Sequence, residues 1–151
     1  IIRYRKKLKI YGYIFDGYWR SVKNIRQYYD MSMDFLEEET QNLFFKTKPY
    51  FYTKVKDEAP AKFNSGAKVS RSLMGGGVII NGTIDNSILF RKVYVGDQAV
   101  IRNSIIMEGT TIGKNCIIEY AILDKGVVVS DNQQVIGTKE KLLILPNRTI
   151  V

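Results

Sequence analysis

Few side chains in this 151-residue sequence can do covalent or metal chemistry. It contains no histidine, which excludes a histidine base, a histidine–aspartate relay and a histidine-ligated metal within these residues. Its single cysteine, Cys116, excludes an internal disulfide and a cysteine-cluster metal site, and fits a reducing compartment. The glycine run 75–77 lacks the helix and the Lys-Ser/Thr pair of a phosphate-binding loop. We therefore expect no metal site and no cofactor in these residues.

Positive charge is the remaining chemical signal. The net charge is +8, and basic residues are densest in residues 1–23, where they are interleaved with tyrosines. Such interleaving occurs in nucleic-acid-binding proteins, but it also fits a β-strand with a basic outer face. A third interpretation is a site for an anionic small molecule such as a sugar phosphate, and charge alone does not separate the last two. We expect no nucleic-acid partner.

The sequence predicts a soluble, cytoplasmic segment of a larger protein. No apolar run approaches the roughly 18 residues of a membrane span, so we expect no membrane partner. The sequence begins Ile1-Ile2-Arg3 without Met, and its basic residues interrupt any apolar core of a signal peptide.

The first 40 residues predict one strand and one helix. Residues 8–15 are rich in β-branched and aromatic residues and predict a strand, ended by the turn signal Asp16-Gly17. Asn24 fits a helix N-cap, with Gln27 as its capping-box partner. Apolar residues then follow at helical spacing; they are Val22, Ile25, Tyr29, Met33 and Leu36. We expect the acidic run 37–39 to end this helix, because the helix dipole disfavours it there.

Residues 40–65 contain two of the three prolines and predict an irregular connector, with a short strand at 50–53. After residue 66 the sequence repeats every 17 residues. In rows that start at Val78, the first column holds aliphatic residues: Val78, Val95, Ile112 and Val129. The seventh column does so as well: Ile84, Ile101, Ile118 and Val135. A shorter turn at 69–73 precedes the rows at a spacing of 15.

A 17-residue period is too short for a helical hairpin or a propeller blade, and it divides into three short strands with a corner after each. Strands wound in this way stack like residues in ladders about 4.8 Å apart. The hexads beginning at Val95 and Ile112 resemble the hexapeptide repeat of left-handed β-helices. We therefore predict a mainly β chain with a left-handed parallel β-helix of 17-residue coils; the alternative is a β-sandwich with chance spacing. The tail 141–146 caps the last coil or pairs with the preceding domain.

Three segments resemble the ADP-glucose pyrophosphorylase (glucose-1-phosphate adenylyltransferase) family, in the family's order and across nearly the whole chain. Residues 15–25 resemble the family's Gly-Tyr-Trp-x-Asp-Val-Gly-Thr-Ile at the end of its catalytic domain. Residues 59–63 resemble its Pro-Pro-Ala-Lys-Phe, and Asn86-Ser87-Ile88-Leu89 is similar to its β-helix. The resemblance implies that 1–40 end a nucleotidyltransferase domain as a small α/β remnant, that 41–65 are a connector and that 66–151 are the β-helix.

Ser21 is the most informative departure from the family. The family's catalytic members carry an aspartate there that helps to hold the catalytic metal, and a neutral hydroxyl is a poor ligand for a hard cation. The following Gly-Thr is replaced by Lys23-Asn24. The resemblance thus implies a non-catalytic, regulatory-type subunit; a purely structural alternative is that Ser21 caps the helix. The family uses Mg²⁺ with ATP, but we expect neither to be bound by these residues.

The resemblance implies a role in glycogen synthesis, where the family transfers an adenylyl group from ATP to glucose 1-phosphate and releases pyrophosphate. We expect this chain to serve subunit assembly and allosteric response, with a paralogous catalytic subunit, a further copy of itself, or both as partners. An anionic sugar-phosphate effector is expected near the domain junction. Its candidate ligands are Lys54, Lys56, Lys62 and Arg71, although the simpler explanation is that they are solvated surface charges.

Three other functions stay open from the residues. The chain could be a stand-alone β-helix binding or scaffold module, or part of an active nucleotidyltransferase that tolerates Ser21. A β-helix acyltransferase is disfavoured, because such enzymes generally use a catalytic histidine and there is none here.

Overall fold

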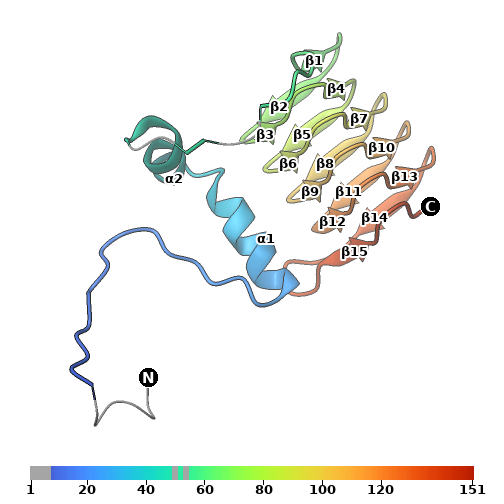
Figure 1. The fold of residues 1–151 in the computed structure, drawn as a ribbon. Coiled ribbons are helices and arrows are strands. Elements are labelled where there is room, and N and C mark those ends of the chain that lie inside the picture. Colours follow the sequence, from blue (N-terminus) through green and yellow to red (C-terminus); the bar gives the residue numbers. More distant parts are fainter. Residues whose placement is uncertain (1–7, 49–50, 53–54) are drawn as a thin grey trace.

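The computed structural model describes residues 8–48, 51–52 and 55–151. From Lys62 onward the chain winds into a parallel β-helix, and each coil adds one short strand to each of three sheets (Figure 1). Each sheet has five parallel strands. This confirms the prediction of a mainly β solenoid with 17-residue coils.

The three sheets are named A, B and C in chain order. Sheet A contains β1 (Lys62–Phe63), β4 (Ile79–Ile80), β7 (Tyr94–Val95), β10 (Thr111–Ile112) and β13 (Val128–Val129). Sheet B contains β2 (Lys68–Ser70), β5 (Thr83–Asp85), β8 (Val100–Arg102), β11 (Ile117–Glu119) and β14 (Gln134–Ile136). Sheet C contains β3 (Leu73–Met74), β6 (Ile88–Leu89), β9 (Ile105–Ile106), β12 (Ala121–Leu123) and β15 (Leu143–Leu145).

Ladders of aliphatic side chains fill the interior of the β-helix. The predicted ladder of sheet B is confirmed, because its members pair in register from coil to coil; they are Ile84, Ile101, Ile118 and Val135. All four are buried. Burying a side chain of this size stabilises the fold by roughly 1.5–3 kcal/mol, so the stacked ladders account for much of its stability.

One interior ladder differs from the predicted column. Ile80, not Val78, pairs with Val95, because the corner between β4 and β5 is only Asn81-Gly82, whereas residues 96–99 form the next corner of the same kind. The coil is therefore two residues shorter, which explains the spacing of 15 between Val69 and Ile84. Val78 is still buried, one corner earlier.

The corners between sheets B and C need the left-handed backbone conformation. Asn86, Asn103 and Tyr120 occupy this position with φ of 47°, 48° and 46°. Asparagine tolerates this region better than most residues, which explains its recurrence in the repeat. Asn86 Nδ2 also donates to Asn103 Oδ1 at 2.7 Å, so the side chains of successive coils bond along the corner.

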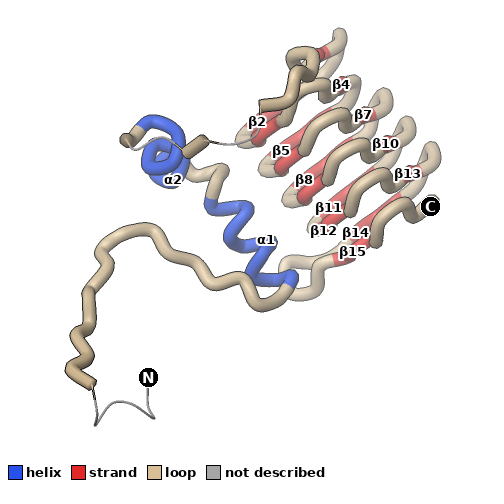
Figure 2. Tube along the Cα trace, in the orientation of Figure 1, coloured by secondary structure: helices blue, strands red, loops and turns tan. Residues whose placement is uncertain are grey.

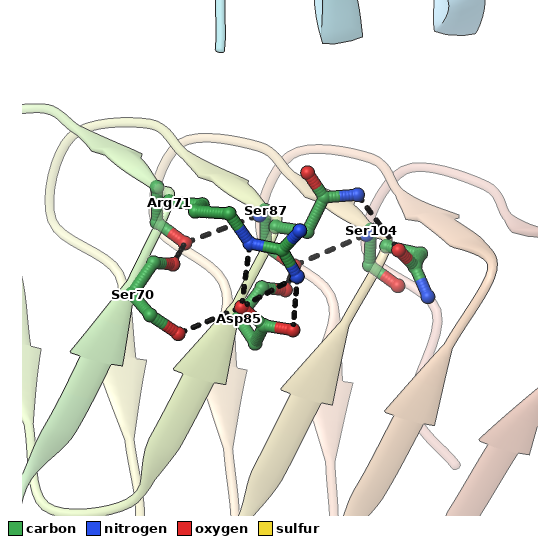
Figure 3. A network of polar contacts seen from close by, with 8 residues as sticks. Ser70, Arg71, Asp85, Ser87 and Ser104 are labelled. Carbon is green, nitrogen blue, oxygen red and sulfur yellow. Dashed lines mark hydrogen bonds and ion pairs between the residues drawn. The ribbon is translucent and has the colours of Figure 1, made fainter.

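Buried serines form a second ladder beside these asparagines (Figure 3). Ser104 N donates to Ser87 Oγ at 3.2 Å, and Ala121 N donates to Ser104 Oγ at 3.1 Å. Each hydroxyl in turn donates to the carbonyl two residues earlier, on Asp85 for Ser87 and on Arg102 for Ser104. The buried hydroxyls are therefore satisfied, as a buried polar group requires.

The C-terminal tail extends the β-helix. β15 pairs with β12 through Ile122 and Ile144, which completes sheet C. Ile150 forms a parallel bridge with Val128 and so continues sheet A. The tail therefore caps the last coil, which is one of its two predicted roles. It also contacts the helix that precedes the β-helix.

The segment before the β-helix differs from the prediction in three places. Residues 8–15 form no strand (Figure 2), because no other described segment pairs with them. Their side chains are exposed. The expected irregular connector is also partly helical: α2 (Glu38–Gln41) is followed by the π-helix Asn42–Lys46. Of the strand expected at 50–53, Phe51 and Tyr52 are not in a strand, and 50 and 53 lie outside the described residues.

The predicted helix is present as α1 (Ile25–Asp34). Gln27 N donates to Asn24 Oδ1 at 2.8 Å, which confirms the N-cap, while Gln27 Oε1 accepts from Lys23 N rather than from Asn24 N. The helix ends before the acidic run, as predicted. Among the described residues, no helix is long and apolar enough to cross a membrane.

Substitution of Gly82 tests the short corner. A Cβ at this position would lie 2.2 Å from the carbonyl oxygen of Ala99, and neither backbone can move without breaking the ladder. We expect Gly82→Ala to lower the free energy of unfolding by about 1–3 kcal/mol, the usual cost of overpacking. Urea unfolding measures this, with Gly12→Ala as the control because its Cβ would meet no atom within 4 Å. Equal stability of the two variants would contradict the conclusion that Asn81-Gly82 form a tight two-residue corner.

Candidate functional site

Helix α1 lies against the outer face of sheet C. The outward positions of this sheet are aliphatic in every coil; they are Leu73, Ile88, Ile105, Ile122 and Ile144. Ile105 is 0% and Ile122 3% exposed, because Tyr29 packs on them together with Tyr28, Met33, Met107 and Leu142. The segment before the β-helix is therefore joined to it by an apolar contact of its own.

Two hydrogen bonds fix the position of α1 on sheet C. Tyr29 Oη donates to the Asn103 carbonyl at 2.7 Å, and Arg26 donates to the Lys139 carbonyl in the tail. Burial, and to a smaller extent the nearby Tyr120, raises the pKa of Tyr29 to about 12. The phenol therefore stays protonated and keeps its bond in neutral solution.

Ser21 lies in a shallow hollow beside α1, lined by Trp19, Arg20, Gln27, Asp30 and Met31. It does not cap the helix, since Asn24 does so. Carboxylates near it are already paired: Asp30 Oδ1 accepts from Arg26 Nε at 2.9 Å, and Asp34 Oδ2 accepts from Arg20 Nε at 2.6 Å.

Those pairings make the hollow a poor site for the family's Mg²⁺. This ion prefers oxygen ligands, above all carboxylates, but here each nearby carboxylate faces an arginine. Across the described ranges, no group of three or more acidic, histidine or cysteine side chains is placed to hold a metal ion. The residues present therefore do not fit Mg²⁺.

An aromatic cluster holds the segment around Ser21 against the short helices. Tyr18 Oη donates to Asp34 Oδ2 at 2.9 Å, and the Tyr18 ring meets Phe44 edge-on at 5.2 Å between centroids. Phe35 packs on Phe44 at 5.0 Å. Burial and the Asp34 hydrogen bond raise the pKa of Tyr18. This cluster fixes the position of Tyr18 and so of the chain that leads to Ser21.

The candidate effector residues lie in different parts of the structure. Lys54 lies outside the described residues. Lys56 Nζ lies 3.7 Å from Glu108 Oε1, at the corner between sheets C and A, and Lys62 is exposed in the first strand of sheet A. Arg71 is at the corner between sheets B and C, where its Nη2 lies 2.9 Å from Asp85 Oδ2 (Figure 3). Hydrogen bonds from Ser70 and Arg71 lower the pKa of Asp85.

Sequence reasoning missed a second hollow, at the corner between sheets C and A. It is lined by Tyr28 of α1 together with Phe90, Arg91, Met107, Glu108, Asp124 and Lys125. The buried Arg91 Nε makes no hydrogen bond and lies 3.7 Å from Glu108 Oε1. Because Lys56 faces the same carboxylate, three cations and the two carboxylates Glu108 and Asp124 lie around this hollow. The signal was available in the sequence: charged residues recur here at 91, 108 and 125, one period apart.

Comparison with known proteins shows which family this β-helix belongs to. The family model described as "GlmU-like, C-terminal hexapeptide" matches residues 59–142. The chain belongs to this family. The matched residues begin just before β1 and end just before β15, so the family model covers most of the three-sheet β-helix.

The curated relatives of this chain include glucose-1-phosphate adenylyltransferases and GlgD glycogen biosynthesis proteins. It is 37% identical over 93 residues to a glucose-1-phosphate adenylyltransferase of Desulfitobacterium hafniense, which is 62% of this chain and 23% of that protein. It is 36% identical over 89 residues to the glycogen biosynthesis protein GlgD of Bacillus subtilis, 59% of this chain and 26% of that protein. For GlgD of Geobacillus stearothermophilus the values are 44% over 71 residues, 46% and 20%.

These relatives confirm the resemblance to the glucose-1-phosphate adenylyltransferase family. The chain spans only about a quarter of the length of the curated relatives it matches.

The contact of α1 with sheet C predicts an alkaline transition. Tyr29 is neutral in the fold up to its pKa of about 12, whereas an unfolded tyrosine ionises near pH 10. Its stabilising contribution is complete below about pH 10 and is lost as the pH rises towards 12. We expect Tyr29→Phe to lower the free energy of unfolding at pH 7 by about 1 kcal/mol and to lack this alkaline loss.

The control for Tyr29→Phe is Tyr52→Phe, because Tyr52 is 93% exposed. Chemical unfolding of both variants between pH 7 and 11.5 provides the measurement. An equal alkaline loss in both variants would show that the Tyr29 hydroxyl does not hold α1 in place.

Proposed function

We propose that this chain is the C-terminal region of a glucose-1-phosphate adenylyltransferase-related protein of glycogen synthesis, and that it serves regulation and assembly rather than catalysis. The observation that carries this proposal is the fixed contact between α1 and sheet C. It joins the segment that resembles the end of a catalytic domain to the β-helix through Tyr29, Ile105 and Ile122. A ligand that moves one element must therefore act on the other.

The surroundings of Ser21 support a non-catalytic role. Its hydroxyl replaces the carboxylate of the family's catalytic members, and both nearby aspartates are paired with arginines. The relatives named GlgD glycogen biosynthesis protein carry a different name from the adenylyltransferases, which fits a distinct type of subunit. The paralogous adenylyltransferase is the partner we propose for assembly.

An effector with several negative charges fits the cationic side chains of the β-helix. The hollow with Arg91 and Lys125 lies beside Tyr28 of α1, and Lys56 faces Glu108 of this hollow, so an anion bound there would contact both elements. Lys62 and Arg71 remain the other proposed ligands, although Arg71 is already paired with Asp85. Lys54 is part of the same proposal.

The non-catalytic role is tested with the full-length protein alone. We expect no pyrophosphorolysis of ADP-glucose when the protein is assayed with Mg²⁺ and pyrophosphate in the absence of its paralogue. The paralogous adenylyltransferase, assayed in parallel, is the positive control. Measurable turnover that follows the purified protein through two different columns would overturn the proposal.

The effector ligands are tested in the complex of full-length protein and paralogue. With a sugar bisphosphate as the probe, we expect Lys56→Ala, Lys62→Ala and Arg71→Ala to raise the half-saturating concentration, with the smallest change for Arg71 because Asp85 already neutralises it. Lys139→Ala, an exposed lysine in the tail, is the control. Unchanged half-saturation in all three variants would rule out these residues as ligands.

A further inference from the structure

Methionine sulfur lies on both sides of the contact between α1 and sheet C. Tyr29, Ile105 and Ile122 form the buried centre of this contact. Met33 of α1 and Met107, which follows β9, pack against that centre and are half-buried. A thioether fills an irregular apolar gap well, because it is flexible and polarisable. It is also a side chain that a mild oxidant converts into a polar one.

Met107 faces an open hollow as well as the contact. It lines the hollow at the corner between sheets C and A, beside Tyr28 of α1. All four methionines of the sequence lie within the described residues, and Met107 is the one that lines this hollow. Met31 lines the other hollow, beside Ser21, and Met74 packs on the interior of the β-helix. A small oxidant in the hollow therefore reaches Met107 while α1 is still in place.

The same hollow contains a hydrogen-bond donor without a partner. Arg91 Nε is buried and makes no hydrogen bond, since its distance of 3.7 Å from Glu108 Oε1 is too long for one. A buried donor of this kind costs free energy until an acceptor reaches it. The thioether sulfur of Met107 is a weak acceptor, whereas a sulfoxide oxygen is polar. Oxidation therefore creates an acceptor in the hollow where this donor is unpaired.

We propose that Met107 is a site of reversible oxidation by a hydroperoxide, and that its sulfoxide loosens α1 from sheet C. A lone pair of the Met107 sulfur attacks one oxygen of hydrogen peroxide, so that an S–O bond forms and the O–O bond breaks. The sulfur loses two electrons, the peroxide gains them, and the second oxygen leaves as water with both protons. A sulfoxide reductase reverses the step with two thiols, which become a disulfide while the oxygen leaves as water.

The oxidised side chain fits the hollow better than it fits the contact. A polar oxygen buried against Ile105 and Ile122 without a partner is unfavourable. Arg91 and Lys125 offer donors on the side of the hollow. The oxidised Met107 therefore turns towards the hollow, and the cluster under α1 loses one of its apolar side chains. The inference goes beyond the proposed function, because it needs neither an effector nor a second subunit.

Hydrogen exchange of the α1 amides in the full-length protein tests this site, before and after treatment with hydrogen peroxide. We expect peptide mass spectra to show one added oxygen at Met107, and exchange to become at least tenfold faster in the oxidised protein. Reductases for both sulfoxide epimers, supplied with dithiothreitol, should reverse both changes.

Two leucine variants assign the effect to one sulfur atom. Met107→Leu has a similar volume and no sulfur, so its α1 amides should still exchange slowly after peroxide treatment. Met31→Leu is the matched control on α1, at a residue outside the contact, and it should loosen as the unchanged protein does. Faster exchange in oxidised Met107→Leu, or a Met107 that stays unoxidised while Met31 reacts, would overturn the proposal.

A polar substitution separates this loosening from other effects of peroxide. Met107→Gln places an amide where the sulfoxide forms, and we expect it to speed α1 exchange about tenfold without any oxidant. Met31→Gln is the control and should leave the exchange unchanged, while circular dichroism checks that each variant keeps the β-helix. Slow α1 exchange in Met107→Gln would refute the proposal. None of these outcomes depends on nucleotide, effector or subunit binding, so they stand apart from the tests of the proposed function.

Discussion

The backbone hydrogen bonds between successive coils are the constraint on which the rest of this structure depends. Each coil bonds only to its neighbours, so every strand pairs in register with the strand one coil earlier and presents the same face to the interior. The interior ladders follow from that repetition, because a position that points inward in one coil points inward in all of them. The asparagine and serine ladders at one corner follow for the same reason, with Ser87 and Ser104 bonding to the coil beyond.

Repetition also explains how much of the fold could be predicted. A single interior position such as Ile101 carries little information, but its equivalents at 17-residue intervals reveal the period and the three-sided section. The corner at Asn81-Gly82 was missed, because a two-residue deletion in one coil shifts the first column without disturbing the seventh. The prediction of a strand at 8–15 was wrong. A strand needs a partner strand, and amino-acid composition does not show whether such a partner is present.

The candidate site was harder to predict, because charge in a sequence does not show how it is paired. Arg71 carries the positive charge expected of an anion ligand, yet its guanidinium is already paired with Asp85. The contact of α1 with sheet C did leave a signal: the pairs Ile88-Leu89 and Ile105-Ile106 are aliphatic on both faces of their strands, whereas a face open to water usually alternates. A strand apolar on both faces indicates a cover, and here the cover is α1.

The short corner at Gly82 has a consequence for how the chain finds its pairing. A perfectly periodic solenoid can align one coil too early or too late, since each wrong alignment satisfies nearly the same ladders. Here a shift would place a longer corner where only Asn81-Gly82 fits, and would bring a Cβ against the carbonyl that Gly82 accommodates. The irregular coil therefore fixes the pairing register, because it leaves an otherwise repetitive chain with a single way to align its coils.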